Sequence, residues 1–379
     1  MMAHRTEPYL YGRDGTRYPL GEPRWRGDDG APLMVSGLEG ISGVEIDSSQ
    51  RSHWRYAAAL PLPAATRRVC LGEGCTPLLP ARAGGLEVQV KAEWLNPTGS
   101  FKDRGTSVMV SMLRQQGIER ILEDSSGNGG SSVAAYAAAA GMQAKILVPE
   151  GTSSAKILQS RVLGAEIEIV PGTREDTASE AVRQSSQIFY ASHNWHPFFL
   201  QGIKLMAYEL WEDLGFRAPD NVVVPAGAGS SVLGLWIGFS ELLRAGQVAR
   251  IPRILAAQPQ LCSPLAKAFS QGLPEAAQGE WRKTLAEGTS ISRPVRDREV
   301  LAAVSASQGG FQAVSESEII SATRELVAQG LYTEPTSATT AAAVPGLVEQ
   351  GLLNAGETTV LVLTGSGIKA AESMAKIID

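Results

Sequence analysis

Lys102 is the residue of this chain best placed to do covalent chemistry. It stands in the segment 96–105, NPTGSFKDRG, which hydrophobic patterning does not explain. Three later segments, 125–130, 225–231 and 363–367, are also rich in glycine and hydroxyl side chains, and each follows an apolar run. A lysine that forms a Schiff base needs an anion cradle, a partner for an aromatic nitrogen and donors for a carboxylate. Alone, Lys102 would be an ordinary surface lysine; with the three other segments it becomes a candidate nucleophile.

A lysine must lose its proton before it can act as a nucleophile or a base. A free lysine has a pKa near ~10.4, and burial or an adjacent cation lowers that pKa. Arg104 is close enough in sequence to act on Lys102 in this way. The alternative is that Arg104 pairs with Asp103 as part of the scaffold.

The segment 125–130 reads Ser-Ser-Gly-Asn-Gly-Gly and lies between a short apolar run and an alanine-rich helical pattern. Backbone N–H groups at the start of a helix, together with two hydroxyls, form an anion site. The simpler interpretation is a strand-to-helix turn with an N-cap residue.

The segment 225–231, Pro-Ala-Gly-Ala-Gly-Ser-Ser, also follows a strand pattern and precedes a helical one. Small residues let backbone amides close around a phosphate. No Gly-Lys-Ser/Thr follows, so the segment is not a P-loop, and Gly234 comes too late for a dinucleotide fingerprint.

Strand and helix patterns alternate from residue 85 onward, which predicts an α/β architecture. No internal repeat or low-complexity tract is evident. The expected strands are 86–91, 121–123, 144–149, 167–171, 221–225, 254–257 and 359–363, and the expected helices are 106–116, 131–140 and 232–243.

Taken together and in this order, the four segments resemble the tryptophan-synthase-like family of pyridoxal-phosphate enzymes, called fold type II. The threonine synthase branch is the most similar, because the segment 72–78, GEGCTPL, resembles its opening signature. The resemblance runs from Gly72 to the end of the chain. It implies two open, twisted, mostly parallel sheets flanked by helices. It also implies a large cofactor-binding domain (66–104 and 191–379), a small domain (105–190) and an N-terminal extension (1–65).

The resemblance also implies roles for individual residues. Lys102 would carry pyridoxal 5'-phosphate as a Schiff base, and Thr364 would face the pyridine nitrogen with a neutral hydroxyl. A neutral partner makes the ring a weaker electron sink, which favours elimination and replacement over transamination. Glu334, in the segment 334–338, is a further candidate near the ring. The expected phosphate cradle is Gly227, Ala228, Gly229, Ser230 and Ser231; the substrate carboxylate would bind Ser125, Ser126, Gly127 and Asn128, and Asn128 would also contact the ring hydroxyl.

The predicted reaction is elimination or replacement on an L-amino acid, as in threonine synthase, which converts O-phosphohomoserine and water to threonine and phosphate. Phe198 and Phe199 stand where the family has an arginine, which weakens phosphate recognition. Lys156 and Arg161 could substitute for it. The alternatives are a serine or threonine dehydratase and, from another class, a non-catalytic nucleotide-binding protein that uses the glycines at 227 and 229.

Composition sets the remaining limits. The 379 residues allow two domains, and the net charge of −5 argues against a nucleic-acid partner. No apolar run is long enough to span a membrane, and the first residues lack a secretory signal, so we expect a cytoplasmic protein. Three cysteines fit a reducing compartment and cannot form a four-cysteine zinc site. We expect no metal at His193 and His196, a small-molecule partner and, by analogy with the family, a homodimer.

The N-terminal stretch 24–33, RWRGDDGAPL, resembles half of a zinc-ribbon knuckle without its cysteines. Turns and packing would have to hold such a module, and a plain N-terminal arm wrapped on the body is the alternative.

Overall fold

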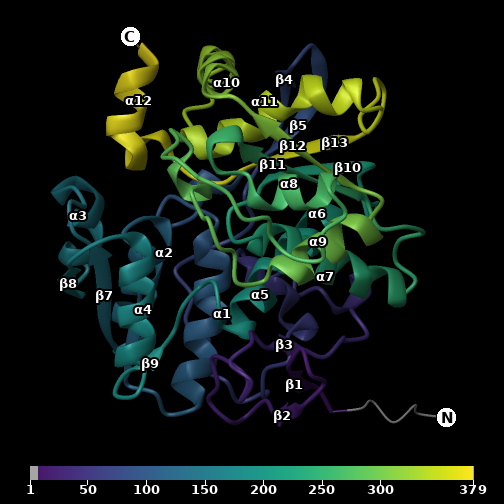
Figure 1. Ribbon diagram of the computed structural model, residues 1–379. Helices are drawn as coiled ribbons and strands as arrows, with labels where there is room; N and C mark the ends of the chain where they lie inside the picture. Colours follow the sequence, from purple (N-terminus) through teal and green to yellow (C-terminus); the bar gives the residue numbers. More distant parts are fainter. Residues whose placement is uncertain (1–6, 379) are drawn as a thin grey trace.

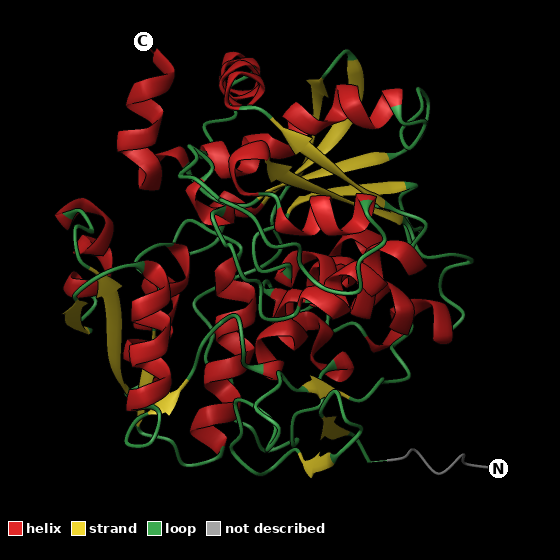
Figure 2. Ribbon diagram, in the orientation of Figure 1, coloured by secondary structure: helices red, strands yellow, loops and turns green. Residues whose placement is uncertain are grey.

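A six-stranded sheet forms the centre of the larger part of the molecule in the computed structural model, which describes residues 7–378 (Figures 1 and 2). All neighbouring strands run parallel except the edge pair β4–β5. The strand order is β12 (Gly310–Val314), β11 (Arg253–Pro259), β10 (Asn221–Pro225), β13 (Thr359–Leu363), β5 (Leu86–Ala92) and β4 (Leu78–Ala83).

Both faces of this sheet are buried, which explains why its central strands are apolar runs without alternation. Val223 and Leu361 point to one face and pack in a cluster with α11. Val222 and Val360 point to the other and pack in a cluster with α7. Figure 1 shows α10 and α11 on one side of the sheet, with α7, α8 and α9 on the other. The helices are α6 (Leu205–Asp213), α7 (Ser230–Arg244), α8 (Pro264–Ser270), α9 (Asp297–Ala306), α10 (Glu316–Ala328), α11 (Pro335–Glu349) and α12 (Ala371–Ile378).

A second, fully parallel sheet lies beside the first body, with the order β8 (Glu166–Val170), β7 (Gln143–Pro149), β6 (Arg120–Glu123) and β9 (Phe189–Tyr190). On one face Ile121 and Ile146 cluster with the alanine-rich α2, and on the other Leu122 and Leu147 cluster with Ala181 of α4. Two mostly parallel sheets flanked by helices confirm the predicted fold class. The helices of this part are α1 (Lys102–Gln115), α2 (Asn128–Ala140), α3 (Ser154–Val162) and α4 (Arg174–Gln184). Helix α5 (Pro197–Ile203) packs against both α1 and α7.

The N-terminal stretch folds into a small module at the end of the molecule opposite α12 (Figure 1). Its sheet has the order β2 (Arg17–Pro19), β1 (Tyr9–Tyr11) and β3 (Met34–Val35). The knuckle-like stretch closes as a turn, in which the N–H of Gly27 donates to the carbonyl of Ala31 at 2.9 Å. Leu10, Leu33 and Phe198 share one apolar cluster, so packing joins this module to α5.

Short 3₁₀ helices connect the larger elements, and they lie at η1 (Gly43–Glu45), η2 (His53–Ala59), η3 (Glu93–Leu95), η4 (Gln260–Cys262), η5 (Glu287–Thr289) and η6 (Gly367–Ala370). Within residues 7–378, no helix is both long and apolar enough to cross a membrane.

Candidate active site

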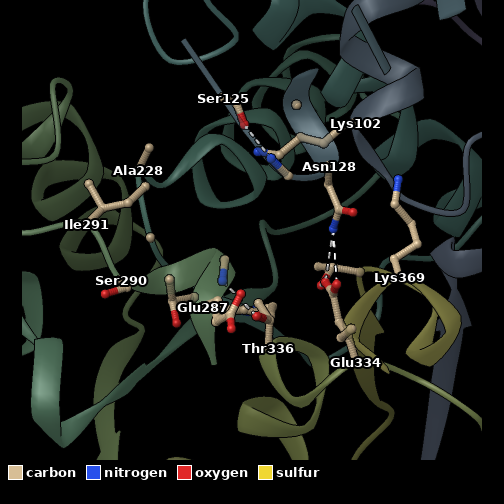
Figure 3. Close-up of a pocket in the computed structure, with 18 of the residues that line it drawn as sticks. Lys102, Ser125, Asn128, Ala228, Glu287, Ser290, Ile291, Glu334, Thr336 and Lys369 are labelled. Carbon is tan, nitrogen blue, oxygen red and sulfur yellow. Dashed lines mark hydrogen bonds between the residues drawn. The ribbon is translucent and has the colours of Figure 1, made fainter. Parts of the chain in front are cut away.

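A polar cavity lies where loops from both sheets meet, beyond the carboxyl ends of β6, β10 and β13. Parallel sheets commonly bind ligands at this edge. The cavity has a volume of about 240 Å³. A single water needs roughly 10–15 Å³ on the same measure, so a small organic molecule fits. The four segments singled out in the sequence all contribute residues to its wall. Figure 3 shows residues from three of them, Lys102, Ser125, Asn128 and Ala228.

Lys102 begins α1 and lines the cavity. Its segment is fixed by backbone hydrogen bonds to the end of β13: the N–H of Phe101 donates to the carbonyl of Thr364 at 2.9 Å. Burial lowers the pKa of Lys102 to about 8, against the opposing effect of Glu123 and Glu334. The amine is therefore available as a nucleophile and a base only slightly above neutral pH.

Arg104 neither lowers the pKa of Lys102 nor pairs with Asp103, the two roles expected from its position in the sequence. It is fully buried and pairs with Glu93 and Glu209, at 2.7 and 2.8 Å. Asp103 instead accepts hydrogen bonds from Thr98 and Ser132. The Arg104 charge belongs to a buried ion-pair network, in which two carboxylates satisfy the guanidinium.

The Ser125–Asn128 segment forms the turn between β6 and α2, and all four residues line the cavity. Asn128 is the first residue of α2, and its amide nitrogen donates to both carboxylate oxygens of Glu334, at 3.3 and 3.1 Å (Figure 3). The first N–H groups of a helix have no partner within it, and the start of α2 lines the cavity, as an anion site requires.

The Gly227–Ser231 segment lies at the start of α7, and every one of its residues lines the cavity. Gly229 has a φ of +83°, and a Cβ added there would overlap Val300. A Cβ on Gly227 would lie 2.8 Å from the carbonyl oxygen of Gly288. Only glycines allow the loop to close this tightly on its neighbours.

Thr364 directly follows β13, and its hydroxyl lies 3.2 Å from Glu334 Oε1 and 3.1 Å from the hydroxyl of Ser337. Glu334 caps the start of α11 and is nearly buried, and that burial raises the pKa of its carboxyl group. Glu334 thus bridges Asn128 and Thr364. The sequence placed it near the site but did not reveal this bridge.

The two phenylalanines at 198 and 199 belong to the core of α5 and do not line the cavity. Phe199 packs on α1, where a Cβ on Gly105 would lie 2.5 Å from its ring. A substrate phosphate in the cavity would therefore not contact these two side chains. Of the two basic residues expected to replace the arginine, Lys156 lines the cavity and Arg161 is exposed elsewhere on α3.

Several residues of the cavity were missed by sequence reasoning. Arg174, at the start of α4, lines it and pairs with Asp124 at 2.6 Å. Lys369 also lines it, and its Nζ donates to Ser131 Oγ at 2.7 Å. The one signal for Lys369 in the sequence was its position two residues after the segment 363–367. The loop 285–291, which faces Gly227, carried none.

His193 and His196 lie in different surroundings and have different partners. His193 lines the cavity and pairs with Glu123, whereas His196 accepts a hydrogen bond from the N–H of Phe198 and caps α5. Among residues 7–378, no three histidine, cysteine or acidic side chains are grouped so that they could hold a metal ion.

Comparison with known proteins identifies the family. Residues 69–365 match the family described as "Pyridoxal-phosphate dependent enzyme". The threonine synthase of Methanocaldococcus jannaschii is 34% identical, with 87% of this chain and 83% of that protein covered. The threonine synthase of Synechocystis sp. is 36% identical, with 85% of each covered. Among solved structures, threonine deaminase isoform 2 from Solanum lycopersicum has a TM-score of 0.68 at 20% identity, covering 80% of this chain and 86% of that one.

These matches contradict the alternative of a non-catalytic nucleotide-binding protein. This chain therefore belongs to the pyridoxal-phosphate dependent enzyme family and is a fold type II lyase that depends on pyridoxal phosphate.

Proposed function

We propose that the enzyme converts O-phosphohomoserine and water to threonine and phosphate. The observation that carries this proposal is the combination of threonine synthase relatives over most of the chain with three basic side chains, besides Lys102, in the cavity wall. Lys156, Arg174 and Lys369 come from three separate elements, and a phosphorylated substrate needs such a cationic surface.

Lys102 is the residue that we assign to the covalent bond with the cofactor. Its amine has a pKa lowered by burial to about 8, and its backbone is fixed to the end of β13. Lys369 is the one other cavity lysine with a pKa near 8, also lowered by burial. Its Nζ is already engaged by Thr98 and Ser131, which supports Lys102 as the nucleophile.

The phosphate group of the cofactor would lie on the Gly227–Ser231 loop. The tight backbone at Gly227 and Gly229 and the free N–H groups at the start of the 15-residue α7 fit a phosphate ester. The pyridine ring would lie by Asn128 and Thr364, which Glu334 links. When bound, pyridoxal phosphate supplies an electron sink for bonds broken at the substrate α-carbon.

The substrate carboxylate would bind at Ser125–Asn128, because the hydroxyls and the first N–H groups of α2 converge there. Lys102, at the start of α1, would then carry the proton of the substrate α-carbon. The side chain of the substrate would extend to Lys156 and Arg174. Each of these cations has an acidic partner, Glu287 at 2.7 Å and Asp124 at 2.6 Å respectively.

A dehydratase that acts on serine or threonine is the second candidate function. One observation favours it: Lys156 and Arg174 are already neutralised, so the net charge offered to a phosphate is smaller than the count of cations suggests. Such a lyase removes only a hydroxyl group and needs no phosphate site.

One assay separates the two functions. The purified enzyme with its cofactor is given O-phosphohomoserine, serine or threonine, and phosphate, threonine, ammonia and keto acid are measured. Threonine and phosphate from O-phosphohomoserine support the proposal. Ammonia and keto acid from serine or threonine, without turnover of the phosphorylated substrate, would overturn it in favour of the dehydratase.

A further inference from the structure

A buried pair of side chains, Glu123 and His193, stands at the cavity without a part in the chemistry described so far. His193 Nδ1 lies 3.0 Å from Glu123 Oε2, and the backbone N–H of His193 donates to the same oxygen at 3.0 Å. Glu123 is fully buried, and His193 is 7% exposed. The other carboxylate oxygen accepts from the N–H of Asp124 at 2.9 Å.

This pattern fixes the tautomer of the imidazole. Glu123 receives backbone donors on both oxygens and acts as an acceptor, so Nδ1 of His193 carries the proton and donates it. Nε2 is left with its lone pair, and no described residue hydrogen-bonds to it. Burial and the nearby charge of Lys102 lower the pKa of His193 well below its ordinary value, so the ring is neutral.

The imidazole of His193 lies close to the place proposed for the substrate. A Cβ added to Gly129 would lie 2.7 Å from Cε1 of His193, so the imidazole packs on the first turn of α2 beside the proposed carboxylate loop. Glu123 and Asp124, adjacent at the end of β6, hold His193 and Arg174 respectively. The charged groups around the imidazole are thus Glu123 and Asp124 from β6, Lys102 from α1 and Arg174 from α4.

We propose that His193, oriented by Glu123, is a second catalytic residue, the general base that activates the water which adds to the β-carbon of the substrate after phosphate has left the γ-carbon. The inference rests on the proposed function. As the water oxygen bonds to the substrate carbon, one O–H bond breaks and its proton moves to Nε2. The Glu123 carboxylate stabilises the imidazolium, and the proton passes to bulk water when the products leave. Lys102 remains assigned to the α-carbon.

The ratio of threonine to 2-oxobutyrate among the products tests whether His193 is the general base. Without an activated water, the substrate still loses phosphate but is then hydrolysed to 2-oxobutyrate and ammonia. In His193→Asn and His193→Gln enzymes we expect phosphate release to continue, while threonine formation falls by about 10²-fold or more, the usual contribution of a general base. Glu123→Gln should lower the threonine fraction less, because the ring is kept.

The matched control is His196→Asn. His196 lies on the same loop and is buried outside the cavity, and asparagine keeps an acceptor for the start of α5. Its threonine to 2-oxobutyrate ratio should equal that of wild type. Cofactor absorbance and thermal unfolding of every variant confirm that the site is loaded and folded.

A second measurement does not depend on turnover. Nitrogen-15 NMR of the histidine-labelled enzyme, with the His193 signals identified by loss in His193→Asn, should show a proton on Nδ1 and none on Nε2. The role of His193 alone would be overturned by any one of three results. These are an unchanged product ratio in both His193 variants, a parallel fall of phosphate and threonine, and a proton on Nε2. A wild-type enzyme inactive on O-phosphohomoserine would overturn the proposed function and this inference with it.

Discussion

The hydroxyl of Thr364 lies 3.2 Å from the carboxylate of Glu334. That carboxylate also accepts from the amide of Asn128, so one acidic side chain joins the residue expected at the pyridine nitrogen to the residue expected at the ring hydroxyl. Ser337 completes the arrangement from α11. The neutral hydroxyl at the end of β13 is therefore held by a hydrogen-bond network, which limits where its proton can point.

Removing that hydroxyl should weaken cofactor binding. In Thr364→Ala, Glu334 and Ser337 each lose a partner inside a buried site, which costs roughly 1–3 kcal/mol. We expect the dissociation constant for pyridoxal phosphate to rise about 5- to 150-fold in titrations of the apoenzyme. Thr364→Ser keeps the hydroxyl and should stay within a few-fold of wild type; equal binding by the alanine and serine variants would contradict the assignment.

Reduction with borohydride should trap the cofactor on Lys102. Mass spectrometry of the digested enzyme is expected to find the added mass on the peptide that contains Lys102 and to leave Lys369 unmodified. Lys369 is the internal control, because it lines the same cavity and has a similar pKa of about 8. Label on Lys369 would refute the assignment of the nucleophile.

Covalent capture of the cofactor by the apoenzyme should depend on pH through Lys102. Burial lowers the pKa of Lys102 from an ordinary value of 10.5 to about 8, so the reactive neutral amine is the minor form below pH 8. The capture rate should rise about tenfold per pH unit below 8 and level off above it. The stability consequence has the same direction: the cost of burying the charged amine is fully present below pH 8 and disappears as pH approaches 10.5.

Stopped-flow absorbance of wild type and Lys369→Met checks this dependence, and both proteins should give the same midpoint. A midpoint near 10.5 in either protein would show that Lys102 is not shifted.

Gly229→Ala should release the cofactor. The new Cβ would overlap Val300, and the φ of +83° strains any other residue by roughly 1–2 kcal/mol. We expect loss of cofactor absorbance after dialysis and a lower melting temperature. Gly246→Ala is the matched control, because its φ is +67° and nothing lies within 4 Å of the added Cβ. Equal cofactor retention in the two variants would argue against the cradle.

Phe199→Arg should destabilise the protein and create no phosphate site. Phe199 is a fully buried residue of α5 that packs on Gly105 of α1, and a guanidinium there would put a charge into the apolar core. Burying a charge in place of an aromatic ring is one of the severe classes of substitution, so we expect a loss of several kcal/mol in the free energy of unfolding. Phe199→Leu should lose less, and urea denaturation measures both; a stable arginine variant with a lower KM for O-phosphohomoserine would contradict the core position of Phe199.

The fold class and the segments that line the cavity could be predicted from the amino-acid sequence alone. Apolar runs such as 221–225 and 359–363 are long enough and uniform enough to predict buried parallel strands, and the glycine-rich turns that follow them stand where ligands bind. Lys102, Asn128 and Thr364 were recognisable because local motifs surround them.

The pairing of side chains from distant elements becomes visible only in the folded protein. The places of Arg174 and Lys369 in the cavity wall and the pairing of Arg104 depend on contacts between residues far apart in the sequence. No local pattern encodes such contacts. His193 had ligand-like spacing with His196 in the sequence, but the fold directs one ring to Glu123 and the cavity and the other to the start of α5. The sequence lists the ionisable groups, whereas burial and the choice of partner, which set their pKa and their chemistry, arise only when the sheets and helices pack.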